Sequence, residues 1–280
     1  AGYLGAYCEL GKLYRDVDNN LDLALENFKL GAAQREVGCE LALGYSYEKN
    51  LNDLTQAHRW YQKAAEQGSS TALFNLGLIY HYGRGVVKDI PKAIEFYVKS
   101  AELGDDTAWL NLAIIYDFGQ GVGADHSLAL KYYQRAADLG NGQAQSNLGF
   151  MYEVGKGVAV DAVKAHIWYE KSASQNNPQG LNNLATFYRE GVVVAQNQAK
   201  AVDLYRRAAA LGNDYALNNL GKCYLQGWGI EKNDVAAFSH FKQAADRGFE
   251  DAIEWTGLMY FDGVGVDKDE EKAIVYLQKT

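Results

Sequence analysis

The chain of 280 residues has little proline, little cysteine and no long apolar run, and each shortage excludes a class of structure. It contains two prolines and three cysteines. So few prolines suit an all-helical chain, and three cysteines do not make a disulfide framework. No run approaches the roughly 20 apolar residues that span a bilayer. The first residues also do not resemble a signal peptide, although a leader removed beforehand would leave no trace.

An excess of basic residues is missing as well. The chain has 27 Lys and Arg against 35 Asp and Glu, a formal net charge of −8. Nucleic acids and anionic membranes select clustered Lys and Arg. We therefore expect no nucleic-acid partner and no membrane insertion. The 48% hydrophobic and 22% charged residues are ordinary for a globular protein.

What the sequence does have is a repeated unit, seen most clearly in residues 105–140. Leu112 and Tyr116 are four residues apart, as on one face of an α-helix. A Gly-x-Gly turn follows, then Asp125, a residue type that caps helices, and Ala129 on a second apolar face. The unit is predicted to be a helical hairpin.

This unit occurs eight times along the chain. The first-helix tyrosine recurs at spacings of 33, 33 and then 36 residues as Tyr14, Tyr47, Tyr80, Tyr116, Tyr152, Tyr188, Tyr224 and Tyr260. Such a period predicts an all-α, right-handed α/α superhelical solenoid in a single domain over 1–280. The predicted repeats cover approximately 5–35, 38–68, 71–104, 107–140, 143–176, 179–212, 215–248 and 251–280.

Three columns of the repeat have structural explanations. A capping residue, worth about 1 kcal/mol, stands four positions before the second-helix alanine in every copy: Asn20, Asp53, Asp89, Asp125, Asp161, Asn197, Asn233 and Asp269. Glycine occupies the middle of six first helices, where it costs about 1 kcal/mol relative to alanine. We expect close approach of the second helix to offset that cost, with the Tyr97 ring beside Gly77.

The loops between the helices carry a third column. Five repeats have Gly-x-Gly, without the preceding strand or the following Gly-Lys-Ser/Thr of a phosphate-binding loop. The sixth reads Gly191-Val192-Val193-Val194. A β-branched residue resists positive φ, so this loop is predicted to follow another path.

The cysteines and histidines give no sign of a metal centre. Cys39 occupies an alanine column and Cys223 a column of Ile and Met, so both are interpreted as core packing. Cys8 is left open. The histidines have no zinc-ligand spacing: His58, His81, His126, His166 and His240. We expect no metal and no cofactor.

The combined pattern Ala-x-x-x-Leu-Gly-x-x-Tyr, Gly-x-Gly-Val and Asp-x-x-x-Ala-x-x-x-Tyr-x-x-Ala-Ala-x-x-Gly resembles the Sel-one-like repeat, a relative of the tetratricopeptide repeat. Residues 72–104 match it almost throughout. The resemblance implies a non-catalytic, TPR-like adaptor or scaffold that binds a protein or peptide, with strict 36-residue spacing similar to bacterial members.

Members of this family act in quality-control complexes, as bacterial secreted or periplasmic factors, and as immunity proteins against secreted toxin enzymes. The compartment stays open between periplasmic or secreted and cytoplasmic. The array stops inside its last second helix without an obvious polar cap. We interpret it as part of a longer array, or as one whose uncapped ends are covered by a partner or by self-association.

By analogy with tetratricopeptide arrays, the first helices would line a concave partner-binding face. The residues nominated for it are Leu41, Tyr45, Phe74, Leu78, His81, Tyr82, Leu110, Ile114, Phe118, Phe150, Asn182 and Asn218. The alternative is that these side chains pack between neighbouring first helices. The asparagines of another first-helix column, Asn75 to Asn219, would bond a peptide or, as we favour, brace the adjacent repeat.

An enzyme acting on β-lactam or peptidoglycan-like substrates is the alternative from another class. Its only motif is Ser239-x-x-Lys242, which matches the Ser-x-x-Lys of penicillin-recognising enzymes without a Ser-Asp-Asn. The resemblance adds one cysteine-rich branch credited with binding penicillin-like compounds, but its paired cysteines are missing here. We interpret Ser239 as a surface serine and expect no catalysis.

Overall fold

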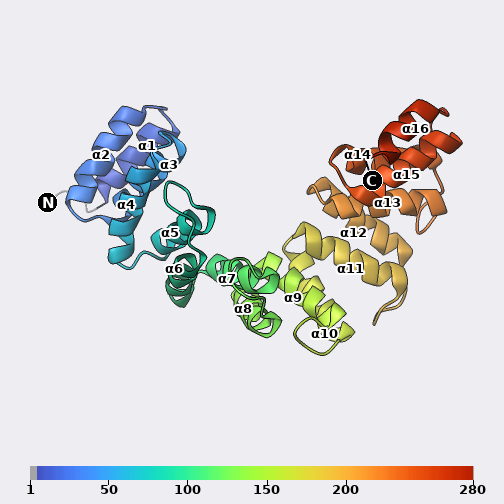
Figure 1. Ribbon diagram of the computed structural model, residues 1–280, viewed down its shortest axis with the longest axis horizontal. Coiled ribbons are helices and arrows are strands. Elements are labelled where there is room, and N and C mark those ends of the chain that lie inside the picture. Colours follow the sequence, from blue (N-terminus) through green and yellow to red (C-terminus); the bar gives the residue numbers. More distant parts are fainter. Residues whose placement is uncertain (1–4, 280) are drawn as a thin grey trace. The chain divides into compact units, whose positions relative to one another are not determined.

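A computed structural model describes residues 5–279, and within that range the secondary structure is helical, with no strand. Consecutive helices form eight helix-turn-helix repeats, so the all-α solenoid prediction is confirmed (Figure 1). The chain divides into two compact units, one ending at Leu139 and one beginning at Gly140. The single domain over 1–280 stays a prediction.

The first unit holds four hairpins: α1 (Ala6–Asp16), α2 (Leu21–Ala33), α3 (Val37–Lys49), α4 (Leu54–Glu66), α5 (Ser70–Tyr82), α6 (Ile90–Glu102), α7 (Asp106–Phe118) and α8 (His126–Asp138). The second unit holds four more: α9 (Gly142–Val154), α10 (Ala162–Ser174), α11 (Pro178–Glu190), α12 (Gln198–Ala210), α13 (Asp214–Gln226), α14 (Asp234–Asp246), α15 (Glu250–Asp262) and α16 (Glu270–Leu277).

The two helices of a hairpin approach closely at the glycine of the first helix. A Cβ added at Gly77 would lie 2.5 Å from Cδ1 and Cε1 of Tyr97, and one at Gly44 would lie 2.5 Å from Cε1 of Tyr61. Both rings are fully buried. The predicted packing of a second-helix ring on the mid-helix glycine is therefore confirmed.

The hydroxyl of each buried second-helix tyrosine reaches a polar group near the end of its first helix. Tyr61 Oη donates to Glu48 Oε2 at 3.0 Å, and Tyr169 Oη donates to Glu153. Tyr205 Oη lies 2.9 Å from Thr186 Oγ1. Burial raises the pKa of Tyr205 to about 12, so the phenol stays protonated. These bonds satisfy buried oxygens and fix the hairpin register.

The capping column behaves as the sequence predicts. All eight Asp or Asn side chains accept a hydrogen bond from the backbone N–H three residues later, as Asp125 does from Leu128 at 2.9 Å. The second helix of every repeat therefore starts at the same place.

The prediction for the sixth loop is wrong. Val193 has φ 54°, in the same left-handed region as Gly229 at φ 67° in the next repeat. The Asn197 N–H donates to the Tyr188 carbonyl at 2.7 Å, a closing bond that the other loops share. The repeat geometry imposes its path on the loop, and Val193 carries the strain.

Neighbouring first helices also touch directly inside each unit. α1 contacts α3 in the first unit, and α9 contacts α11 in the second. Contacts between adjacent first helices can shield side chains that would otherwise face a partner.

Candidate functional site

Among residues 5–139, the most exposed aromatic residues lie on one face of successive first helices. Tyr45 of α3 is 48% exposed, Tyr82 of α5 58% and Phe118 of α7 68%. Relative to the repeat tyrosine, Tyr45 stands two positions before, and the other two stand two positions after. These positions differ by one helical turn and share a face. Leu78 and Ile114, half-buried on that face, complete the group that we call the aromatic strip.

Two arginine side chains contact the rings of the aromatic strip. The Arg15 guanidinium lies 5.1 Å from the Tyr45 ring centroid, and that of Arg84 lies 5.0 Å from the Tyr82 ring. Arg84 also pairs with Glu48 at 3.2 Å. The rings are therefore exposed and yet oriented, which lowers the entropy that binding would cost.

His81 is buried beneath the strip and does not face solvent. Its ring stacks on Tyr82 with centroids 4.6 Å apart. Nε2 lies 3.0 Å from Gln120 Oε1 and Nδ1 lies 3.3 Å from Tyr97 Oη. Burial lowers the pKa of His81 below its usual value. The neutral ring can donate to Gln120 and accept from Tyr97, so His81 supports Tyr82 from below.

The nominated column six positions before the repeat tyrosine turns inward. Leu41, Phe74 and Leu110 are half-buried, and Asn182 and Asn218 are buried. Phe74 packs against Tyr97 with ring centroids 5.7 Å apart. The side chains of this column offer a partner less surface than the exposed rings of Tyr82 and Phe118, and the choice between a partner-binding face and packing between helices stays a prediction.

The asparagine column bonds within the protein, and one of its members braces an adjacent repeat. Asn219 Nδ2 donates to Asn182 Oδ1, one repeat earlier, at 3.0 Å. Asn183 Oδ1 accepts from Gln179 Nε2 at 2.9 Å, and Asn111 Nδ2 donates to the Thr107 carbonyl of its own helix at 2.8 Å. The amides of these three asparagines make intramolecular bonds.

The second unit presents a different surface on its first helices. Phe150 of α9 is 47% exposed, but the same face carries Thr186 in α11 and Lys222 in α13. A pocket there is lined in part by Arg189, Lys222 and Trp228, with Arg189 5.7 Å from the Trp228 ring. The apolar character of this face is therefore interrupted in α11 and α13, although Val154 of α9 and Leu258 of α15 are exposed on it.

Ser239 has no catalytic arrangement around it. It is an exposed residue of α14 whose Oγ accepts from Gln243 Nε2 at 3.3 Å. Lys242 Nζ is 2.6 Å from Asp246 Oδ2, and this hydrogen bond raises the pKa of Lys242. A paired ammonium cannot take a proton from a serine hydroxyl, so the geometry gives the hydrolase alternative no support.

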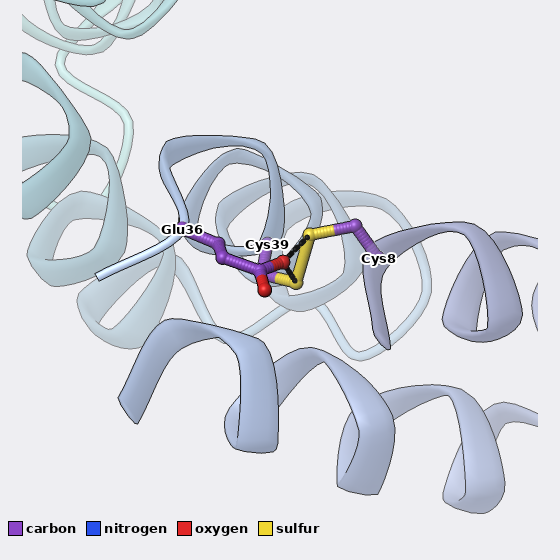
Figure 2. Close-up of side chains that lie close together, drawn as sticks. All are labelled: Cys8, Glu36 and Cys39. Atoms are coloured by element: carbon purple, nitrogen blue, oxygen red, sulfur yellow. Dashed lines mark hydrogen bonds between the residues drawn. A yellow bond between two sulfur atoms is a disulfide. The ribbon is translucent and has the colours of Figure 1, made fainter. Parts of the chain in front are cut away.

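The interpretation of Cys39 as plain core packing is wrong, and so is the expectation that this chain lacks paired cysteines. Cys39 of α3 and Cys8 of α1 form a disulfide with Cα atoms 5.0 Å apart, while Cys223 is free and buried as predicted (Figure 2). Burial raises the pKa of the Cys223 thiol to about 11, which makes it inert.

Glu36 points its side chain at this disulfide. Its Oε2 lies 3.0 Å from Cys8 Sγ and 3.5 Å from Cys39 Sγ, the two contacts dashed in Figure 2. Its Oε1 accepts from the Gly5 N–H at 3.1 Å. Spacing along the sequence did not reveal this group, because Cys8 lies in α1 whereas Glu36 and Cys39 lie at the start of α3.

The repeat tyrosine, the stacked hairpins and the capping column recur in one family of proteins. A family model described as "Sel1 repeat" matches residues 3–36, 31–69, 70–105, 110–141, 142–177, 178–213, 214–249 and 251–280. The chain belongs to the Sel1 repeat family. Sel1 repeats form solenoids that typically serve as protein-interaction scaffolds.

Solved structures agree with this assignment. A Sel1 repeat protein from Oxalobacter formigenes is 29% identical, with a TM-score of 0.74 over 99% of this chain and 82% of that one. A protective antigen of uropathogenic Escherichia coli with an SLR fold is 31% identical, with a TM-score of 0.62 over 99% and 68%.

An immunity protein from Pseudomonas aeruginosa shares the fold at 22% identity and a TM-score of 0.51, over 75% of this chain and 80% of that one. No curated protein matches. Within residues 5–279, no helix has the length and apolar character that crossing a bilayer requires.

Proposed function

We propose that this Sel1 repeat chain is a non-catalytic scaffold that binds a protein or peptide on the aromatic strip of its first unit. The observation that carries the proposal is the exposure of Tyr45, Tyr82 and Phe118 on one face of three successive first helices. Large aromatic side chains facing water together are typical of interface anchors.

The surroundings of Tyr82 and Phe118 favour a role of these two rings in binding over a role in folding. The Tyr82 ring stacks on His81 and meets Arg84, so truncating the ring would remove exposed surface while leaving the buried bonds of His81 in place. Phe118 is the last residue of α7, where its side chain is more exposed than buried. The Tyr82 side chain is likewise more exposed than buried.

The test is affinity capture by the 280-residue chain, followed by mass spectrometry. The double variant Tyr82→Ser/Phe118→Ser should lose the captured partner and keep wild-type helicity by circular dichroism. A matched control, Leu30→Ser/Leu139→Ser, removes two apolar side chains exposed at second helices of the same unit. Capture undiminished in the strip variant, or lost equally in the control, would reject the strip as the binding surface.

An inhibitor of a secreted toxin enzyme is a narrower form of the same function. The similarity to the Pseudomonas immunity protein supports the fold it would need. Identifying the captured partner as a secreted enzyme, and measuring its inhibition by the chain, distinguishes this form from a general adaptor.

A further inference from the structure

Three residues near the start of the chain, Gly31, Glu36 and Cys39, depart from the residue types of their columns, and they meet Cys8 at one place. Cys8, Gly31, Glu36 and Cys39 come from α1, α2, the residue before α3, and α3 itself. The other repeats act as internal controls, because they show what each column holds when only packing is required.

Glu36 occupies the N-cap position of α3 but does not cap it. The same position in five other first helices holds a side chain that accepts from its own backbone N–H groups: Ser69, Asp105, Asn141, Asn177 and Asn213. Forgoing the cap costs about 1 kcal/mol. The carboxylate is instead buried, with 9% exposure, against the two sulfurs. A packing role does not account for that exchange.

Gly31 makes room for the group. A Cβ at this position would lie 2.1 Å from Cys39 Sγ and 3.1 Å from Glu36 Oε2. The other described second helices carry Ala or Ser in this column: Ala64, Ser100, Ala136, Ser172, Ala208 and Ala244. Glycine here therefore matches the larger side chain of Cys39, which replaces the alanine of most repeats.

When Cys8 and Cys39 form the disulfide, neither sulfur can donate a hydrogen bond to Glu36 Oε2. A disulfide sulfur carries no hydrogen, so the contacts of Glu36 Oε2 become hydrogen bonds only when Cys8 and Cys39 are thiols. The three ligand atoms lie within 4.8 Å of one another, the only such group of His, Cys, Asp or Glu in residues 5–279. Two thiolates and a carboxylate are a donor set that suits Zn²⁺ and similar cations.

We propose that Cys8, Glu36 and Cys39 form a redox-gated site for a thiophilic divalent cation. Reduction of the disulfide by a phosphine and one water gives two thiols and the phosphine oxide. Binding of Zn²⁺ then releases both thiol protons and forms two metal–sulfur bonds, with Glu36 as the third ligand. The Gly5 N–H orients the carboxylate through Oε1. The disulfide form has no thiolate to offer and does not bind the cation.

The test uses the full chain with Zn²⁺ and Co²⁺ as probes. Oxidised and phosphine-reduced samples are titrated against a chromogenic zinc chelator, and Co²⁺ is followed by its sulfur-to-cobalt charge-transfer absorption. We expect one ion per reduced chain and none per oxidised chain. Cys39→Ala, which installs the alanine of most other repeats, should abolish binding. Glu36→Gln should weaken it about tenfold or more.

Two controls keep the result specific. Cys223→Ser removes a buried thiol that belongs to the second unit, and Glu9→Gln removes an exposed carboxylate of α1. Both should bind as wild type, and circular dichroism should show unchanged helicity in every variant. Equal binding by the oxidised chain, no binding by the reduced chain, or wild-type affinity in Glu36→Gln would each overturn the proposal.

Discussion

Replacement of Gly149 by leucine tests the helix packing that shapes every repeat. Gly149 is buried in α9, and a Cβ there would lie 2.7 Å from Cε1 and 2.8 Å from Cδ1 of Tyr169. Ordinary van der Waals contact begins at 3.4 Å. A leucine would place three further carbons in space that the ring fills, and would pull the Tyr169 hydroxyl from Glu153.

The expected change in the free energy of unfolding differs between two substitutions of Gly149. Gly149→Ala gains about 1 kcal/mol of helix propensity and loses about as much by displacing the ring, and the column already tolerates Ala113 and Ala185 in other repeats. It should be nearly neutral. Gly149→Leu overpacks the hairpin and should lose about 3 kcal/mol.

The assay must read one repeat, because a repeat array can open locally. Hydrogen exchange with mass spectrometry should show faster exchange in α9 and α10 of Gly149→Leu, and urea unfolding gives the free energy. Adding Tyr169→Ala should restore part of the loss, since the two side chains then no longer compete. Equal stability of Gly149→Leu and wild type, or strict additivity in the double variant, would refute this packing.

Two further predictions concern strain and protonation. Val193→Gly should stabilise the second unit by about 1 kcal/mol, because a left-handed backbone costs a non-glycine residue about 1–2 kcal/mol; a lower urea midpoint would contradict the strain. The pKa of His81 is lowered by burial. The stabilisation of the fold by neutral His81 is therefore fully present above the pKa of an unfolded histidine, about 6.5. It is lost as the pH falls towards the lower pKa of His81 in the folded protein. The urea midpoint should drop between pH 7.5 and 5.5 more in wild type than in His81→Gln, and equal drops would contradict this.

The fold could be predicted from sequence because each column of the repeat has one physical cause. Capping by Asp125, packing of Tyr97 on Gly77, and helix-face spacing are local, and eight copies make each signal plain. The path of the sixth loop could not be predicted that way. The residue preference of Val193 favours another conformation, but the bond from Asn197 N–H to the Tyr188 carbonyl and the adjoining helices outweigh it.

The candidate sites were only partly predictable. Exposure of Tyr82 and Phe118 follows from helix position, whereas burial of His81 depends on Gln120 from the next repeat. The cysteine group depends on how α1 lies beside α3, which no residue pattern states. Its sequence signals were Gly31, Glu36 and Cys39, each of which departs from the residue type that most repeats have at its position.

The most direct test of the scaffold proposal is hydrogen exchange of the first unit with and without its captured partner. We predict that binding slows exchange at the C-terminal ends of α5 and α7, around Tyr82 and Phe118, and leaves α2, α4 and α6 unchanged. Protection confined to those second helices, with none at the aromatic strip, would contradict the account.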